Sequence, residues 1–297
     1  MLKSKGDIVF GVINYILLLA IMVITIYPLY FIIIASVSNA HSVALGEVWF
    51  WPKGFNLNAY IDVFKEKSIW TGYFNTIVYT ALGTLINLAV TIPCAYALAK
   101  KRLIGRNVIM GIFIFTMYFS GGMVPGYLLV KNLGMLDTIW AMIIPGAVSV
   151  YNMIITRTFF ASSIPEELYE AAKIDGCSEF RAFFTIALPL SAAIIAVMAL
   201  YYGVGHWNEY FNALIYMSNQ DKFPLQLVLR NILIMNQNIN MTQSMTAEQA
   251  EYMAQQAQLA EAMKYAVIFI ASFPVLAAYP FVQKYFVKGV MIGAVKG

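Results

Sequence analysis

The stretch SSIPEELYEAAKIDGCSEFRAFFTIALPL, residues 162–190, carries a cluster of charged residues, is well capped and lies between long uncharged apolar runs. Ser163 and Glu166 match the S-x-x-E capping box, which predicts the start of a helix. Gly176 is placed to end that helix in a left-handed conformation. A second short helix is predicted over 178–187, stopping before Pro189 because proline cannot donate the next backbone hydrogen bond.

This loop is longer than a connection needs to be. About thirty residues of capped structure exceed an ordinary turn between two helices. On the predicted first helix, Leu168, Ala171 and Ala172 form a small, smooth face. The alternative is a solvated connection, but the length favours a docking element for another protein.

The chain as a whole has the amino-acid composition of an integral membrane protein. Of the 297 residues 61% are hydrophobic and 11% are charged, and the mean hydropathy is +0.71. Soluble domains are about half apolar and one quarter charged. The net charge of +4 comes with no basic face, so no nucleic-acid partner is expected. Membrane lipid is the expected surrounding.

Long uncharged runs locate the spans, because a charge at mid-membrane costs about 2.5–3.5 kcal/mol and a crossing takes about 20 residues. Proline lies inside several runs, and SGGMVPG (120–126) predicts a break that is either a packing irregularity or part of a pathway. The fold class predicted is an all-α integral membrane protein. Its six spans are 8–35, 71–99, 108–130, 138–156, 191–208 and 265–283.

Orientation follows the bias of Lys and Arg. With a cytoplasmic N-terminus, 12 basic residues lie inside and 7 outside, and the short cluster KKRLIGR (100–106) carries most weight. Both termini are therefore predicted to be cytoplasmic, and Cys94 and Cys177 then lie on the reducing side, so no structural disulfide is expected. The predicted divisions are an N-terminal span and outer loop (1–70), a core (71–285) with an outer loop (211–263), and a C-terminal tail (286–297).

The loop resembles the EAA loop of binding-protein-dependent ABC importer permeases, whose fold is MetI-like. That pattern is EAA, two residues, DG, then an apolar stretch ending in LP, with departures here at Cys177 and Ala193. The resemblance implies a coupling helix seated in a separate ATP-binding subunit. The positions it implies for ATPase coupling are Glu170, Ala171, Ala172, Asp175, Gly176, Leu188 and Pro189.

Other stretches resemble the sugar-importer branch, the group similar to maltose permeases. They are the end KYFVKGVMIGAVKG (284–297), the stretch SGGMVPGYLLVKNLGMLDTIWAMIIP (120–145) and the Gln-rich outer loop. The subgroup implied imports oligosaccharides from polysaccharide breakdown. The partners implied are a second, homologous permease, a dimer of ATP-binding subunits and an extracytoplasmic sugar-binding protein, in the cytoplasmic membrane of a bacterium.

No catalytic site and no metal site are expected. The chain has no G-x-x-x-x-G-K-[ST] phosphate loop, and its two histidines, His41 and His206, lack companions at ligand spacing. No cofactor is therefore expected on this chain, and ATP and Mg²⁺ are expected on the partner subunits. The rivals are an importer of the same class for a mono- or disaccharide or other small solute, and an ion-driven transporter. The latter would need a charged residue at mid-span, which all six runs lack.

Polar groups within the spans are candidates for the substrate pathway, since they are costly toward lipid and aromatic rings beside amides suit sugars. The alternative is that they bridge helices or lie in an interfacial aromatic belt. The candidates are Asn75, Asn87, Tyr151, Asn152, Tyr202, Trp207, Asn208 and Glu209.

Overall fold

The computed structural model describes residues 5–238, 263–277, 280 and 283, and its regular elements are all helices. The chain divides into two compact units, which are residues 1–69 with 229–273 and residues 70–228 with 274–297. The predicted all-α class is confirmed. The predicted tail 286–297 and residues 239–262 of the predicted outer loop lie outside the described residues.

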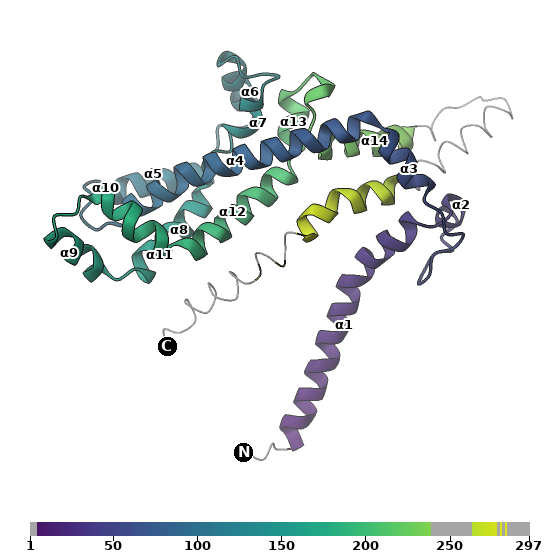
Figure 1. Ribbon diagram of the computed structural model, residues 1–297, viewed down its shortest axis with the longest axis horizontal. Helices are drawn as coiled ribbons and strands as arrows, with labels where there is room; N and C mark the ends of the chain where they lie inside the picture. The colour runs from purple at the N-terminus through teal and green to yellow at the C-terminus, as the bar shows by residue number, and fades with distance from the viewer. Residues whose placement is uncertain (1–4, 239–262, 278–279, 281–282, 284–297) are drawn as a thin grey trace. The chain divides into compact units, whose positions relative to one another are not determined.

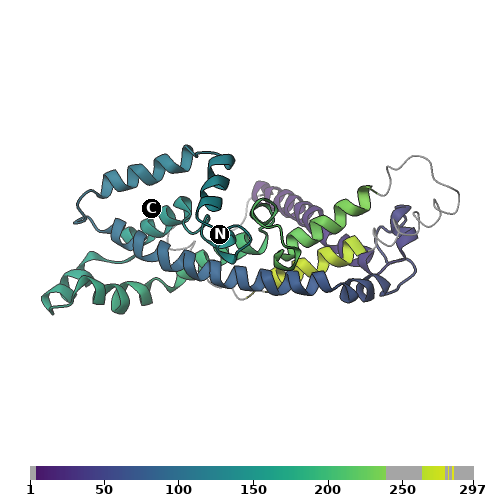
Figure 2. The same cartoon turned by 90° about the horizontal axis from the view of Figure 1, so that it is seen from above.

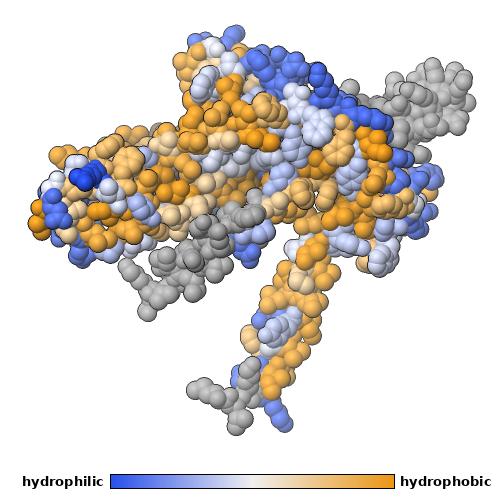
Figure 3. Space-filling view, viewed as in Figure 1, coloured by the Kyte–Doolittle hydropathy of each residue, from blue (hydrophilic) through white to orange (hydrophobic). Residues whose placement is uncertain are grey.

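The first unit begins with α1 (Lys5–Ser36), whose 32 residues carry exposed apolar side chains along nearly the whole helix (Figure 3). At 1.5 Å per residue it is about 48 Å long, more than the roughly 30 Å of hydrocarbon in a bilayer. Two short helices follow, α2 (Ala40–Ala44) and α3 (Asn58–Lys65). Residues 263–273 of the helix Met263–Ala277 belong to the same unit, where the Tyr265 and Phe31 rings lie 5.6 Å apart.

The second unit is built around α4 (Lys67–Ala99), beside which α8 (Val150–Ser163) and α12 (Ala192–Trp207) run (Figure 1). One of its apolar clusters joins the α4 residues Ile92 and Tyr96 to the α8 residues Met153 and Phe160. The remaining elements are α5 (Arg106–Tyr118), α6 (Met123–Asn132), α7 (Ile139–Ile143), α9 (Glu166–Ile174), α10 (Glu179–Ala182), the π turn Phe183–Ala187, α11 (Leu188–Leu190), α13 (Phe211–Tyr216), the 3₁₀ turn Gln220–Lys222 and α14 (Leu225–Asn238).

Two described helices, α1 and α4, are long and apolar enough to cross a membrane without a break. The third predicted span is two helices, α5 and α6, bent by 111° (Figure 2). The bend falls in the predicted break, where Gly122 has φ +89°. The fifth is also a bent pair, 179–190 and 192–207 at 79°, so at most four spans are counted by length and composition.

The fourth predicted span, 138–156, is not one helix but two, because the chain leaves the helix around Pro145 and begins α8 at Val150. Backbone carbonyls freed by such a break need partners inside a membrane. Asn87 of α4 supplies them, since its Nδ2 donates to Gly146 O at 2.7 Å and to Ala147 O at 2.9 Å. The sixth predicted span appears as Met263–Ala277, and most of its remainder lies outside the described residues.

Candidate coupling site

The loop begins differently from the capping-box prediction, which is wrong. Ser163 is still the last residue of α8, and Ile164 then adopts an extended conformation. The N-cap of α9 is Pro165, and no side chain caps this end. Because Ser163 belongs to the preceding helix, its hydroxyl is not placed to cap α9.

The end of α9 confirms the prediction for Gly176, whose φ is +74°. Gly176 N–H donates to Lys173 O at 3.1 Å, and Cys177 N–H donates to Ala172 O at 2.8 Å. This pair of bonds is the Schellman motif, which satisfies the last carbonyls of the helix. The turn between the two helices of the loop is therefore fixed by backbone bonds and not by side chains.

The second helix starts as predicted at Ser178, whose Oγ accepts from Arg181 N–H at 3.3 Å. It does not stop before Pro189. The helix widens into the π turn 183–187, where Leu188 N–H bonds to Phe183 O, and continues through Pro189 to Leu190. Since a π turn pairs residues five apart, it changes the register ahead of a proline that has no N–H to offer. The sharp bend comes later, at Ser191.

The loop is joined to the end of α4 by aromatic packing. The Tyr96 ring lies 5.6 Å from the Phe160 ring, 6.0 Å from the Tyr169 ring and 5.0 Å from the Phe183 ring. These partners come from α8, α9 and the π turn, so one α4 side chain contacts all three segments. Lys100 Nζ lies 2.9 Å from the centroid of Tyr169 and 4.8 Å from that of Tyr96.

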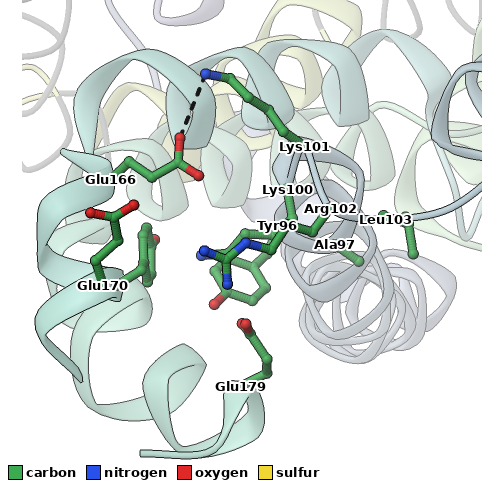
Figure 4. A pocket seen from close by; sticks show the side chains of 10 residues that line it. Tyr96, Ala97, Lys100, Lys101, Arg102, Leu103, Glu166, Glu170 and Glu179 are labelled. Atoms are coloured by element: carbon green, nitrogen blue, oxygen red, sulfur yellow. Dashed lines mark ion pairs between the residues drawn. The ribbon is translucent and has the colours of Figure 1, made fainter. Parts of the chain in front are cut away.

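An open hollow of about 330 Å³, here named the coupling hollow, lies between the end of α4 and the two helices of the loop (Figure 4). Acidic side chains Glu166, Glu170 and Glu179 face basic ones from residues 100–102, and Lys101 Nζ lies 3.6 Å from Glu166 Oε2. Burial, and then the carboxylate of Glu179, raise the pKa of Tyr169 to about 12. The phenol is therefore neutral at physiological pH.

The predicted coupling residues do not all face outward. Glu170, Ala171, Asp175, Gly176 and Pro189 are exposed, and Leu188 is half-buried against the apolar cluster of α4 and α8. Ala172 is 9% exposed, so its predicted place on an open face is wrong. The reason is that the inward face of α9 carries Tyr169, one turn before Ala172.

Sequence reasoning missed two exposed apolar residues of the loop and the contact that secures it. Ile174 is 87% exposed and Phe180 is 75% exposed, at the ends of the helices flanking Gly176. The sequence signal that could have identified these two residues is their apolar character beside a polar turn. The contact of Lys100 with Tyr169 joins positions far apart in sequence, and no local pattern reports it.

The substrate-pathway candidates are mostly engaged within the chain. Asn75 Nδ2 donates to Asp221 O and Phe223 O, Asn87 bonds to the break after α7, and Tyr202 Oη lies 2.7 Å from Thr91 Oγ1. The remaining members differ in exposure. Asn152 and Trp207 are buried, Tyr151 and Asn208 are exposed, and Glu209 is half-buried with Oε1 accepting from Asn212 N–H. Their place in a pathway stays a prediction.

The sequence is similar to those of known transport proteins. The sequence pattern of a family described as "binding-protein-dependent transport system inner membrane component" matches residues 67–292. Protein LplC of Bacillus subtilis is 44% identical over 99% of this chain and 97% of its own length. The polygalacturonan/rhamnogalacturonan transport system permease protein YtcP of the same organism is 38% identical over 97% of this chain and 98% of its own.

A solved structure has the same fold. It is the crystal structure of a bacterial ABC transporter involved in the import of the acidic polysaccharide alginate, with a chain 33% identical to this one. The TM-score is 0.85, over 96% of this chain and 99% of that one. With the family match covering most of the sequence, these similarities identify the chain as a transport permease. It belongs to the family of binding-protein-dependent transport system inner membrane components.

Proposed function

We propose that this chain is one of two permease subunits of an ATP-driven importer that brings oligosaccharides into the bacterial cytoplasm. The names of relatives support the substrate class, since they include a polygalacturonan/rhamnogalacturonan system, an arabinooligosaccharide system and an alginate importer. ATP and Mg²⁺ bind to partner ATPase subunits, and a binding protein delivers the sugar from outside. Both termini lie in the cytoplasm.

The observation that carries the proposal is the form of the loop 162–190. Two helices meet at a turn fixed by Gly176, and exposed apolar side chains, Ile174 and Phe180, flank that turn. Exposed apolar groups on a rigid element favour burial against a partner protein. The other side of the loop packs on Tyr96, at the end of a helix long enough to span the membrane.

This arrangement explains how a partner's movement reaches the spans. A push on α9 or α10 passes to α4 through the Tyr96 contacts, and to α12 through the continuous segment that bends at Ser191. Closure of the ATPase pair therefore tilts two spans together. The chain performs no bond chemistry in this scheme, and it converts a movement at its surface into access to one side of the membrane.

The test uses the complete importer, purified with its partner subunits and reconstituted in proteoliposomes. Uptake of labelled oligogalacturonide or oligoalginate and ATP hydrolysis are measured together. Glu170→Lys should abolish uptake and its link to hydrolysis while the complex keeps its thermal stability. The control is Asp62→Lys, a charge reversal in α3 outside the loop. Uptake that survives Glu170→Lys, or that requires no ATP, would contradict the proposal.

A further inference from the structure

A second hollow shares Lys101 and Glu166 with the coupling hollow, and the proposed function does not use it. This basic hollow of about 360 Å³ is enclosed by the end of α4, the start of α5, the last turns of α8 and the start of α9. Four cationic side chains line it, from Lys100, Lys101, Arg106 and Arg157. Only two acidic ones do, from Glu166 and Glu167, so positive charge is in excess.

Much of that charge has no carboxylate partner. Arg157 Nε donates to Leu98 O at 3.0 Å, and Arg106 Nε makes a long contact of 3.4 Å with Asn107 Oδ1. Among the described residues, the ion pair recorded at this hollow is Lys101 with Glu166 at 3.6 Å, with side chains 79% and 51% exposed. An exposed pair of this kind contributes little to stability, so Lys101 exchanges readily to another anion.

The backbone adds donors on the same side. A smaller hollow shares Lys101 and Arg106 and lies at the N-terminus of α5, a 13-residue helix. Its N-cap is Gly105, which offers no side-chain cap. The first N–H groups of a helix lack internal partners, and the helix dipole favours an anion there.

The position of the hollow indicates which kind of anion it binds. Three of its four cations, Lys100, Lys101 and Arg106, lie where α4 ends and α5 begins, at the edge of two apolar segments. Ile104, between the basic residues of the connecting segment, is 95% exposed. Basic pockets between helices at the cytoplasmic membrane surface suit anionic lipid headgroups, and an exposed apolar side chain beside them suits acyl chains.

We propose that the basic hollow binds the phosphate group of an anionic phospholipid of the inner leaflet, with Lys101, Arg106 and Arg157 as its ligands. This inference rests on the proposed function for the side of the membrane on which the hollow lies. The lipid phosphate competes with Glu166 for Lys101. Lipid bound here therefore changes how firmly the first turn of α9 is held to the end of α4.

The experiment measures lipid association with the purified, assembled importer in phosphatidylcholine nanodiscs. Spin-labelled phosphatidylglycerol is compared with spin-labelled phosphatidylcholine, and the immobilised fraction of each is recorded. The native importer should retain the phosphatidylglycerol preferentially. Lys101→Gln or Arg106→Gln should reduce that preference about fivefold, the factor expected for one basic residue near an anionic surface.

The matched control is Arg102→Gln, which removes the same charge from the same segment but lines the coupling hollow instead. It should leave the preference near the native value. Because Arg157 also bonds to Leu98 O, Arg157→Gln is paired with Arg157→Lys, which should restore most of the preference. If Arg102→Gln and Arg106→Gln lose the phosphatidylglycerol preference equally, the preference comes from general surface charge, and the proposed site is wrong.

Inorganic phosphate provides a further arm. If added phosphate releases the labelled lipid from the native importer as fully as excess unlabelled phosphatidylglycerol does, the site takes a soluble anion and the lipid assignment is wrong. The proposed function is tested separately, because Glu170→Lys should leave lipid association unchanged while abolishing uptake.

Discussion

Lys100 Nζ lies 2.9 Å from the centroid of the Tyr169 ring, so an ammonium at the end of α4 rests on an aromatic ring of α9. A cation over an aromatic face is stabilised by the ring quadrupole, by about 0.5–2 kcal/mol depending on desolvation. Burial lowers the pKa of Lys100, and the carboxylates of Glu179 and Glu166 oppose that shift. The contact links the loop to the end of a membrane-spanning helix.

Replacing Lys100 with Met should loosen α9. The variant keeps an apolar stem against the rings and removes the charge that holds Tyr169. Amide hydrogen exchange over 166–174 should rise about two- to fivefold, the range set by a loss of 0.5–1 kcal/mol. Lys100→Arg should stay near the native rate, because arginine also stacks on aromatic rings. Equal exchange in Lys100→Met and the nearby Arg102→Met would show that the ring contact has no special effect.

Tryptophan placed at two adjacent alanines should have opposite consequences. Ala172 is 9% exposed, so Ala172→Trp overpacks the interior of the loop and should cost about 1–3 kcal/mol of stability. Ala171 is exposed, so Ala171→Trp should keep the melting temperature of the native complex but uncouple ATP hydrolysis from uptake. Melting curves and proteoliposome uptake on the same preparations separate the two effects. Normal coupling in Ala171→Trp would exclude this face from docking.

The contrast between these alanines shows what a sequence pattern can predict. Local backbone rules placed Gly176 correctly, because a left-handed helix end is fixed by a few neighbouring residues. They failed at Ser163, because the length of α8 depends on its packing against α4 and not on the capping sequence. Pro189 likewise lies inside a helix, since a π turn before it accommodates the missing donor.

Contacts between residues far apart in the sequence are the second feature that local sequence patterns do not predict. Asn87 and Tyr202 were predicted as pathway candidates because polar side chains in a span need partners. The structure provides partners within the chain, at the break after α7 and at Thr91. His206, for which the sequence predicts no metal-binding role, places Nε2 2.7 Å from Asn87 Oδ1. Its ring packs so closely on Gly83 that a Cβ there would clash with it.

Asn87→Leu should therefore destabilise the chain. Asn87 is fully buried, and its loss leaves the carbonyls of Gly146 and Ala147 and the His206 ring without their bonds. Unsatisfied buried groups cost about 1–3 kcal/mol each in soluble proteins, and bonds within membranes average about 0.6 kcal/mol. A net loss of about 2 kcal/mol should lower the melting temperature of the detergent-solubilised complex by several degrees. Asn208→Ala, which removes one local bond from an exposed amide, should shift it much less.

Asp137 should give the α6–α7 connection a defined response to acid. Its carboxylate accepts from Ser218 N–H at 2.6 Å and Asn219 N–H at 2.9 Å, joining the α6–α7 connection to the segment after α13. Hydrogen bonds from two backbone N–H groups lower the pKa of Asp137 below its usual value; the bond from Asn219 has the larger effect and the bond from Ser218 the next. A depressed carboxylate pKa gives stability that is complete above the unfolded value of about 3.9 and is lost as the pH falls through the folded value.

The connection should therefore hold from neutral pH down to about 4 and open only below the ordinary range of aspartate. The mobility of a spin label at Gln220, followed by pH titration, measures this. Asp137 has φ +56°, and asparagine tolerates that conformation, so Asp137→Asn should fold but lose the acid transition. Asp221→Asn, in the same segment, should keep it. If the transition persists in Asp137→Asn and disappears in Asp221→Asn, the acid response belongs to Asp221 and this prediction is wrong.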